Sequence, residues 1–365
     1  MRRRSTAVKG AEKIDFHRYL TKTMKAIAVD YTRPNHTPEC FAEITIEQPT
    51  IGAKDLLVRV QAISVNPVDY KVRSSIQDKQ STPRILGWDA AGVVEQVGLQ
   101  VSLFKPGDEV YYAGSITRPG SNSELHAVDE RIVGRKPAYL SFEQAAALPL
   151  TTITAWEALF ERMAIAPQTS ASKRDKHILI IGGAGGVGSI AIQLAKQVAG
   201  LTVIATASRP ETFEWCLNMG ADYTINHHQP FKTELKKIGI QEVDYILCLN
   251  DTEQHLVNMA ETIKPQGKIC SIVETEHPLD MNLLKNKSVT FAWEFMFTRS
   301  MYETDDIQAQ HEILNKVSTL IDQQVIQSTM TEHLGALNPE NLAKAHTQLE
   351  SGRTIGKLVL SGFAQ

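Results

Sequence analysis

Hydrophobic residues follow two different patterns along the chain, and the change between them divides it into two parts. Up to about Leu150, short runs alternate apolar and polar positions, separated by turn residues such as Lys105-Pro-Gly-Asp108. Such alternation is typical of strands with one buried face. The runs predicted as strands include Met24–Tyr31, Leu56–Ser64, Gly92–Gly98 and Glu109–Tyr112. No long amphipathic helix interrupts them, so the front part is predicted to be compact and mostly β.

Near Ser141 the pattern changes to one of helices. Ser141–Ala147 has a helix-start pattern, a helix is predicted over Thr154–Arg162, and the polar segment Pro167–Lys176 follows. Strands and helices then alternate at a steady spacing. The predicted strands are His177–Ile181, Thr202–Ala207, Asp222–Asn226, Val243–Leu249 and Lys268–Val273. The helices between them fall near Val187–Val198, Pro210–Met219, Phe231–Ile238 and Glu253–Ile263. This alternation predicts an α/β fold with a doubly wound parallel sheet.

The end of the chain combines both kinds of element. The pattern predicts a strand over Ser288–Phe297, helices over Asp306–Gln324 and Asn338–Ser351, and a last strand over Lys357–Leu360. No internal repeat or low-complexity run accompanies them.

Composition narrows the class of protein without identifying a function. The 365 residues are 42% hydrophobic and 22% charged, which is typical of a soluble globular protein with a large core. The net charge of −3 gives no reason to expect nucleic acid or an anionic membrane surface as a partner. We therefore expect function to reside in a small-molecule site.

The first 23 residues differ from the rest, with seven basic and two acidic residues and no apolar core of a signal peptide. We interpret them as a disordered tail, or as translation from an early start before Met24; the alternative is a targeting or docking role.

The longest uncharged stretch, His177–Ala195, holds five clustered glycines and is better explained as strand, turn and helix than as a membrane span. The four cysteines are scattered, which favours reduced thiols in a cytoplasmic protein: Cys40, Cys216, Cys248 and Cys270.

A glycine-rich turn lies where the first strand of the alternating region meets its first helix. Gly183-x-Gly185-x-x-Gly188 follows His177–Ile181 and opens the helix Val187–Val198. Without a Cβ at the turn, backbone amides can approach a pyrophosphate, and the helix N-terminus favours its charge. The motif therefore predicts a dinucleotide site; the alternative is a tight turn with no ligand.

The end of the next strand indicates which dinucleotide is bound. NAD-binding chains place a carboxylate there to hold the ribose 2′-hydroxyl. Here the segment reads Thr206-Ala-Ser208-Arg209, and a guanidinium suits phosphate oxygens. NADP(H) is therefore the predicted cofactor. The alternative is that Arg209 only caps or solvates a helix start.

Several segments in matching order resemble the medium-chain dehydrogenase/reductase superfamily, and most closely its quinone oxidoreductase branch with the zinc-type alcohol dehydrogenase-like proteins. They are Asn66-Pro-Val-Asp69, Gly87-Trp-Asp-Ala-Ala-Gly92, Pro106-Gly-Asp-Glu-Val110, Ala145–Leu159, Gly182–Gly188 and Thr354-Ile-Gly-Lys357. The resemblance implies a GroES-like catalytic domain over 24–150, a Rossmann domain over 151–300 and a return to the catalytic domain over 301–365. It also implies a homodimer.

The chain departs from the zinc-binding members of that superfamily at each ligand position. Asn66 stands where they carry a cysteine, Trp88-Asp89 replaces His-Glu, and Leu150–Thr154 offers no thiolate. A catalytic zinc needs about three protein ligands, which a solitary Asp89 does not supply. The neighbouring His227 and His228 are predicted to lie in a surface turn. The sequence therefore predicts no bound metal.

The resemblance implies roles for individual residues. Cofactor contacts fall on Asn66, Thr154, Gly183, Gly185, Gly186, Val187, Gly188, Ser208, Arg209, Asn250 and Lys357. Asn66 and Tyr70 are the candidate catalytic residues, with Tyr70 as proton donor or oxyanion-stabilising group. Tyr70 and Trp88 are expected to line an apolar substrate pocket; for each, simple packing is the alternative. Trp293, Phe295 and Phe297 alternate along a strand that in the family pairs across a dimer, or else belong to an ordinary core.

Without a metal or an evident base to acidify an alcohol, the site suits hydride delivery to an electron-poor acceptor. The predicted function is an NADPH-dependent, zinc-independent oxidoreductase acting on a quinone or an α,β-unsaturated carbonyl, with a small apolar electrophile as substrate. Two alternatives remain: a zinc alcohol dehydrogenase with atypical ligands, and an NADPH-binding sensor or structural protein without turnover.

Overall fold

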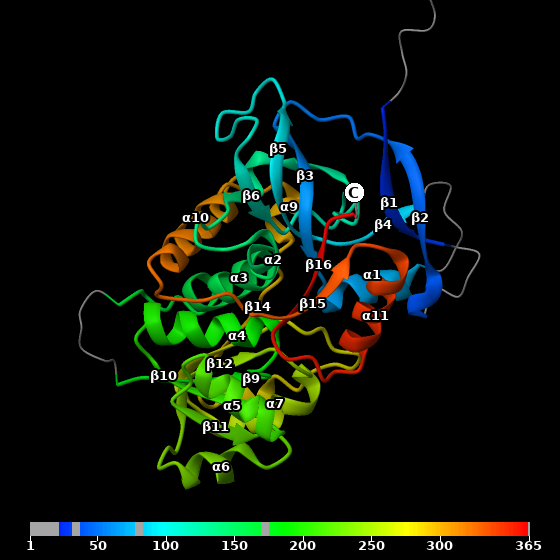
Figure 1. The fold of residues 1–365 in the computed structure, drawn as a ribbon. Coiled ribbons are helices and arrows are strands. Elements are labelled where there is room, and N and C mark those ends of the chain that lie inside the picture. The colour runs from blue at the N-terminus through cyan, green and yellow to red at the C-terminus, as the bar shows by residue number, and fades with distance from the viewer. Residues whose placement is uncertain (1–21, 31–36, 77–82, 169–174, 364–365) are drawn as a thin grey trace, which may run out of the picture.

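The computed structural model describes residues 22–30, 37–76, 83–168 and 175–363. Two layered regions form the molecule: β3, β5 and β6 stand in the upper part of Figure 1, and β9–β12 in the lower part. Almost all of the predicted basic tail, and part of the polar segment Pro167–Lys176, lie outside the described residues.

A six-stranded parallel sheet forms the lower region, as the alternating pattern predicts. Its order is β11-β10-β9-β12-β13-β14. From β9 the chain adds β10 and β11 on one side, and then crosses over to add β12, β13 and β14 on the other side. The strands are β9 (His177–Ile181), β10 (Thr202–Ala207), β11 (Tyr223–Asn226), β12 (Val243–Cys248), β13 (Ile263–Ser271) and β14 (Thr290–Trp293). This is the strand order of a Rossmann fold, whose switch point lies between β9 and β12.

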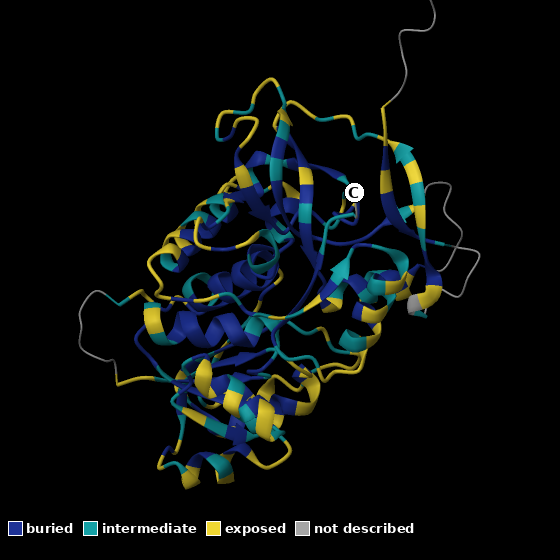
Figure 2. Ribbon diagram, in the orientation of Figure 1, coloured by how far each residue is buried: buried dark blue, intermediate teal, exposed yellow. Residues whose placement is uncertain are grey.

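Alternate residues of β9 enter two separate hydrophobic cores. Ile178 and Ile180 pack into one cluster, and Leu179 and Ile181 into the other. Because successive side chains of a strand point to opposite faces, both faces of the sheet are covered. The helices are α4 (Gly186–Gln193), α5 (Pro210–Asn218), α6 (Phe231–Lys237), α7 (Thr252–Thr262) and α8 (Asn282–Lys285). Figure 2 shows these strands mostly dark blue and yellow residues along α5, α6 and α7, whereas α4 is mostly buried.

The upper region is mostly β, as the front half of the sequence predicts. One sheet has the order β15-β16-β3-β5-β6-β8, with β7 also paired to β3, and a second has the order β2-β1-β4. The bounds are β1 (Thr23–Val29), β2 (Phe41–Glu47), β3 (Asp55–Ser64), β4 (Arg84–Ile85), β5 (Asp89–Val97), β6 (Glu109–Tyr112), β7 (Leu125–Asp129), β8 (Val133–Arg135), β15 (Met330–Ala336) and β16 (Lys357–Ser361). Two short helices belong to it, α1 (Pro67–Ser75) and α2 (Phe142–Ala146), and the sequence pattern did not predict α1.

The last segment of the chain returns to the upper sheet. β16 runs antiparallel to β3, with Val359 opposite Ser64, so its first residue Lys357 is brought to the junction of the two regions. The helices here are α9 (Thr298–Tyr302), α10 (Ala309–Asp322) and α11 (Pro339–Glu350).

Two of the predicted elements whose bounds differ in the structure bear on the candidate site. The helix α3 spans Pro149–Trp156 and continues as a π-helical turn over Glu157–Arg162, so it begins before Thr154, with proline in its first turn. The strand β14 ends at Trp293. Phe295 and Phe297 therefore do not alternate along a strand: Phe295 is exposed beyond it, and Phe297 is buried at the start of α9.

Candidate active site

A cavity of about 650 Å³ lies between the carboxyl ends of the parallel strands and the upper region. Its walls come from α1, the first turns of α3, the β9–α4 turn, the ends of β10 to β13 and Lys357. Ligands of doubly wound folds bind at this edge, because the loops of neighbouring strands diverge at the switch point. The volume suits a cofactor-sized molecule.

The glycine-rich turn forms one wall, and its glycines are needed for close packing. Gly182 has a φ of +83°, and a Cβ on Gly188 would stand 2.5 Å from the carbonyl oxygens of both Gly182 and Gly183. The residues of the motif that line the cavity are Ala184, Gly185, Gly186, Val187 and Gly188, with α4 beginning at Gly186. Free amides at a helix N-terminus can hold an anion at this point.

Gly183 does not line the cavity. It packs inward, because a Cβ there would stand 2.7 Å from Ala205 Cβ and 3.0 Å from Cys216 Sγ. Its role in this structure is to bring the turn close to β10 and α5.

Beside this turn, the end of β10 presents the residues predicted to select NADP. Thr206 Oγ1 accepts a hydrogen bond from Gly182 N (3.0 Å), which fixes the turn to β10. Ser208 and Arg209 follow, and both line the cavity. The guanidinium of Arg209 donates to the carbonyl of Arg353 (2.9 Å) and lies 2.8 Å from Glu211. It is therefore held in place at the start of α5 while part of it faces the cavity.

His227 also lines this end of the cavity, a position that was not predicted from the sequence. Its Nδ1 lies 3.4 Å from Thr206 Oγ1. Burial lowers the pKa of His227 to about 4, and nearby His228, His255 and Arg209 act in the same direction. The signal available in the sequence was its position directly after β11, the strand that pairs with β10, at whose end Ser208 and Arg209 lie.

The far end of the cavity brings together three predicted residues from different elements. Thr154 of α3, Tyr70 of α1 and the exposed Asn250 after β12 all line it. Thr154 Oγ1 donates to the carbonyl of Leu150 (2.8 Å), so its lone pairs remain available to a ligand. At the mouth, Lys71 forms an ion pair of 2.6 Å with Glu274, which joins α1 to the loop after β13.

Between the two ends lies a buried network around Lys357. Its ammonium donates to Asn66 Oδ1, to the carbonyl of Val65 (2.8 Å) and to Asp89 Oδ2 (3.0 Å). Asn66 Nδ2 donates to Asp89 (2.7 Å), and Asp89 Oδ1 accepts from Leu150 N (2.8 Å). Each polar end of the Asn66 side chain thus has one partner, and Asn66 also lines the cavity, so its catalytic role stays a prediction.

Asp69, on the first turn of α1, borders this network without joining it. Its Oδ2 accepts from the backbone N–H of Asn66 (2.6 Å), which completes the N-terminal cap of the helix. Complete burial raises the pKa of Asp69 to about 7.

Comparison with known proteins identifies the family. Residues 52–149 match the alcohol dehydrogenase GroES-like domain, and residues 219–360 match the zinc-binding dehydrogenase family. A zinc-type alcohol dehydrogenase-like protein of Staphylococcus epidermidis is 46% identical over 93% of this chain and 99% of its own length. The chain belongs to the medium-chain dehydrogenase/reductase superfamily, in its quinone oxidoreductase branch. It is an oxidoreductase of that family.

More distant relatives include the 2-methylene-furan-3-one reductase of tomato, 29% identical over 87% of this chain and 74% of its length. Among solved structures, a Rhizobium etli protein assigned as a zinc-dependent alcohol dehydrogenase superposes with a TM-score of 0.88 at 46% identity, covering 94% of this chain and 99% of that one. The Escherichia coli quinone oxidoreductase in complex with NADPH has a TM-score of 0.74 at 26% identity, covering 92% and 99%.

Some relatives have names that imply a bound zinc ion. The side chains of this chain at the corresponding positions do not fit one. Asn66 and Asp89 are bound to the ammonium of Lys357, which already supplies the positive charge between them. Nowhere in the described residues do three His, Cys, Asp or Glu side chains come together as metal ligands. A zinc site needs about three such donors and an open position.

Trp88, predicted to line the substrate pocket, is fully buried behind it and is not among the residues of the cavity wall. Its indole N–H donates to the carbonyl of Ser115 (3.1 Å), and its ring packs edge-on against Phe297. Phe297 does line the cavity, so Trp88 supports the apolar wall from outside. The packing alternative is the one that the geometry favours.

A pair of buried carboxyls, Glu157 and Glu294, lies beside the apolar wall, and Glu294 itself lines the cavity. Arg299 Nη1 is 2.6 Å from Glu157, and Arg162 Nε is 2.8 Å from Glu294. Burial and the neighbouring Glu157 raise the pKa of Glu294 to about 9, and burial also raises that of Glu157. Repulsion between two buried carboxylates disfavours ionising both, so Glu294 keeps its proton near neutral pH.

This pair should make stability fall as pH rises. Between the ordinary glutamate value and about 9, folded Glu294 holds a proton that the unfolded chain releases, so rising pH favours unfolding. Between about pH 5 and about pH 9, the free energy of unfolding of Glu294→Gln should therefore decrease less than that of the parent. Each unit by which the Glu294 pKa is raised contributes about 1.4 kcal/mol to this difference. Urea unfolding at several pH values measures this. The control is Glu161→Gln, which alters a more exposed partner of Arg299. If the free energy of unfolding depends on pH equally in all three proteins, the raised pKa of Glu294 is contradicted.

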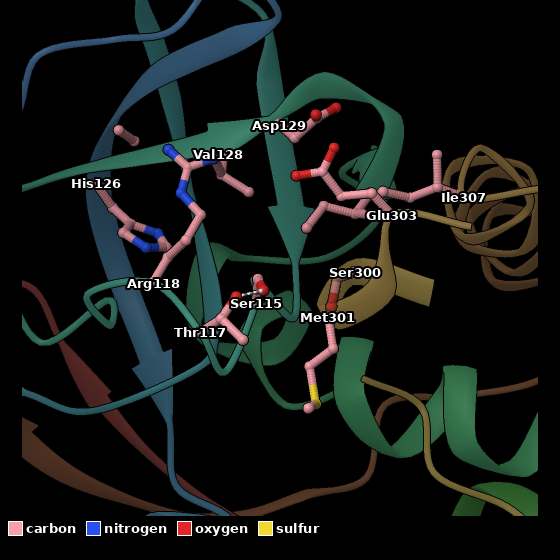
Figure 3. Close-up of a pocket in the computed structure, with 12 residues that line it drawn as sticks. Ser115, Thr117, Arg118, His126, Val128, Asp129, Ser300, Met301, Glu303 and Ile307 are labelled. Atoms are coloured by element: carbon pink, nitrogen blue, oxygen red, sulfur yellow. Dashed lines mark hydrogen bonds between the residues drawn. The ribbon is translucent and has the colours of Figure 1, made fainter. Parts of the chain in front are cut away.

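A second cavity, of about 110 Å³, lies in the upper region against α9 (Figure 3). His126, Arg118 and Asp129 come from its strands and loops, and Glu303 reaches toward them from the end of α9 (Figure 3). Arg118 is held by both oxygens of Asp55, at 2.8 Å each. The volume is too small for a dinucleotide, so the larger cavity is the candidate active site.

In the described part of the chain, no helix has the length and apolar character needed to span a membrane.

Proposed function

We propose that the chain is an NADPH-dependent, zinc-independent reductase of quinones or α,β-unsaturated carbonyls. The observation that carries the proposal is the Lys357 ammonium bound between Asn66 and Asp89, where zinc-dependent relatives are expected to hold metal ligands. Without a Lewis acid, oxidation of a simple alcohol lacks a means to acidify the hydroxyl. Reduction of an electron-poor acceptor by hydride requires no Lewis acid.

NADPH, when bound, supplies the hydride. The glycine turn and the start of α4 are proposed to hold its pyrophosphate, and Ser208 and Arg209 its 2′-phosphate. Thr154 and Asn250 are proposed to orient the nicotinamide from opposite elements, with Lys357 and Asn66 fixing the wall between them. These residues line one continuous cavity, which supports the assignment.

The acceptor end of the cavity is mainly apolar. Ile272, Phe295 and Phe297 contribute its walls and can exclude water from the reacting atoms. The hydroxyl of Tyr70 is the proposed hydrogen-bond donor to the enolate or phenolate oxygen that develops on the acceptor. Such a donor is sufficient because the final proton can come from water.

Cofactor oxidation across a panel of acceptors tests the function. Purified protein should oxidise NADPH with quinones and enones and leave simple aldehydes and ketones unreduced. One tightly bound zinc per chain, lost together with activity, would support the zinc alcohol dehydrogenase alternative. Cofactor binding without turnover on any acceptor would support the sensor or structural alternative.

Arg209→Ala tests the cofactor assignment. Loss of a charge-assisted phosphate contact, about 1.5–3 kcal/mol, should weaken NADPH binding by roughly tenfold to a hundredfold and leave NADH binding nearly unchanged. Cofactor fluorescence titration measures both. Arg353→Ala is the matched control: it removes a neighbouring charge outside the cavity wall while keeping the carbonyl that accepts from Arg209. Equal losses for both cofactors would refute the assignment.

We further propose a cytoplasmic homodimer formed at the β14 edge of the parallel sheet. In support, β14 pairs only with β13 in the described residues, and Trp293 and Phe295 are exposed there. Sedimentation equilibrium gives the oligomeric state.

A further inference from the structure

His227 stands where the proposed 2′-phosphate of NADPH would lie. It is the first residue after β11, and its backbone N–H donates to the carbonyl of Ala207 at the end of β10 (3.3 Å). Asn226 is opposite Ala207 in the parallel register, so His227 lies beside Ser208. His227, Ser208 and Arg209 all line the same end of the cavity. A ligand group bound by Arg209 there is within reach of the imidazole.

The hydrogen bonds around the ring leave one nitrogen for a ligand. Thr206 Oγ1 accepts from Gly182 N, so its own proton can be donated to His227 Nδ1, which lies 3.4 Å away. The neutral ring then carries its proton on Nε2. In the described part of the chain, Nε2 has no hydrogen-bonding partner. It is therefore available to donate to an oxygen in the cavity.

The charges around the imidazole favour an anionic ligand. The ionisable groups acting on it are Arg209 at the start of α5, His228 in the same turn, and His255 on α7. Each is a base, and burial disfavours the imidazolium further, so the ring is neutral near pH 7 when the cavity contains no anion. The carboxylate of Glu211 is paired with Arg209.

We propose that His227 binds the 2′-phosphate of NADPH beside Arg209 and takes up a proton as it does so. This inference rests on the proposed use of NADPH. A phosphate monoester carries about −1.5 to −2 charges near neutral pH and stabilises an adjacent imidazolium. NADH has only a hydroxyl at this position and gives no such stabilisation. Binding of NADPH, and not of NADH, is thus coupled to protonation of the protein.

The coupling has a definite sign. The bound state holds a proton that the free state lacks, so NADPH affinity falls relative to NADH affinity as pH rises through the pKa of His227 in the complex. Ionisation of the phosphate itself, with a second pKa of about 6, acts in the opposite direction. A preference for NADPH that weakens with rising pH therefore reports on the protein.

Binding measurements test this without relying on turnover. Dissociation constants for NADPH and NADH are measured by cofactor fluorescence at about pH 6 and about pH 8, and proton uptake by calorimetry in buffers of different ionisation enthalpy. In the parent protein the NADPH preference should decrease by roughly five- to tenfold over this range, which corresponds to a rise in the pKa of His227 from about 4 in the free protein to about 7 in the complex. His227→Gln, whose amide does not titrate, should show no decrease and no proton uptake. His228→Gln alters the exposed neighbour and should behave as the parent.

The outcomes separate this inference from the proposed function. If the parent shows no preference for NADPH at either pH, the cofactor assignment fails. If the parent prefers NADPH and Arg209→Ala removes the preference, but His227→Gln keeps the pH response, only the role of His227 is refuted. Should His227→Gln not fold, NMR titration of the parent histidines with 2′,5′-ADP replaces it. An unchanged His227 pKa on binding would then refute the role.

Discussion

Gly188→Ala should destroy the cofactor site while leaving the upper region of the molecule folded. A Cβ at this position would stand 2.5 Å from the carbonyl oxygens of Gly182 and Gly183, which are backbone atoms of the turn itself. Because no flexible side chain can move aside, the turn must open and its amides must leave the positions that hold an anion. We expect NADPH and NADH affinities to fall at least about a hundredfold, equivalent to roughly 2.7 kcal/mol.

The matched control is Gly185→Ala in the same turn. There the Cβ would meet only Gly182 O at 3.7 Å, and the backbone at φ −73° is accessible to alanine. This variant should keep the thermal stability of the parent, although its methyl group faces the cavity and can hinder the cofactor. Gly188→Ala should instead lose about 1–3 kcal/mol of stability. Differential scanning calorimetry and fluorescence titration measure the two effects, and parent-like binding by Gly188→Ala would show that the turn is not the cofactor site.

The parallel sheet and the glycine turn could be predicted because their signals are local. An apolar run such as His177–Ile181 followed by Gly183–Gly188 has few other structural solutions, and its strand bounds agree with the structure. The resemblance to the family extended the prediction to the upper region, which the comparisons confirm. The short helix α1 was missed because its nine residues lack a clear apolar stripe, although Asn66 and Pro67 are a typical helix start.

Features that depend on contacts distant in sequence could not be predicted. Whether Trp88 lines a pocket or supports it is decided by Phe297, and the pKa of Glu294 is raised partly by Glu157, which belongs to a segment distant in the sequence. Asn66 is a predicted catalytic residue, but its hydrogen bonds to Asp89 and Lys357 come from segments distant in the sequence and were not predicted. Local patterns contain no information about such partners.

Lys357→Met should be strongly destabilising. Lys357 is 3% exposed, and its ammonium is the donor to Asn66, Val65 and Asp89. Methionine retains a similar aliphatic stem against Gly186 but removes the charge, which leaves the Asp89 carboxylate in a dry interior without its cation. Breaking a buried ion pair from one side costs about 3–5 kcal/mol. Urea unfolding of the parent and the variant at neutral pH measures the loss.

The double variant Lys357→Met/Asp89→Asn distinguishes a charge effect from a packing effect. The amide that replaces the Asp89 carboxylate is neutral and can still accept from Leu150 N. Once the Asn66 amide turns over, it can also donate to the Asn66 oxygen that Lys357 has released. Removing both charges abolishes the buried unpaired carboxylate, so the double variant should recover a substantial part of the stability lost in Lys357→Met. If the two variants are equally unstable, the loss arises from packing around the lysine stem, and the ammonium is not what holds Asn66 and Asp89 together.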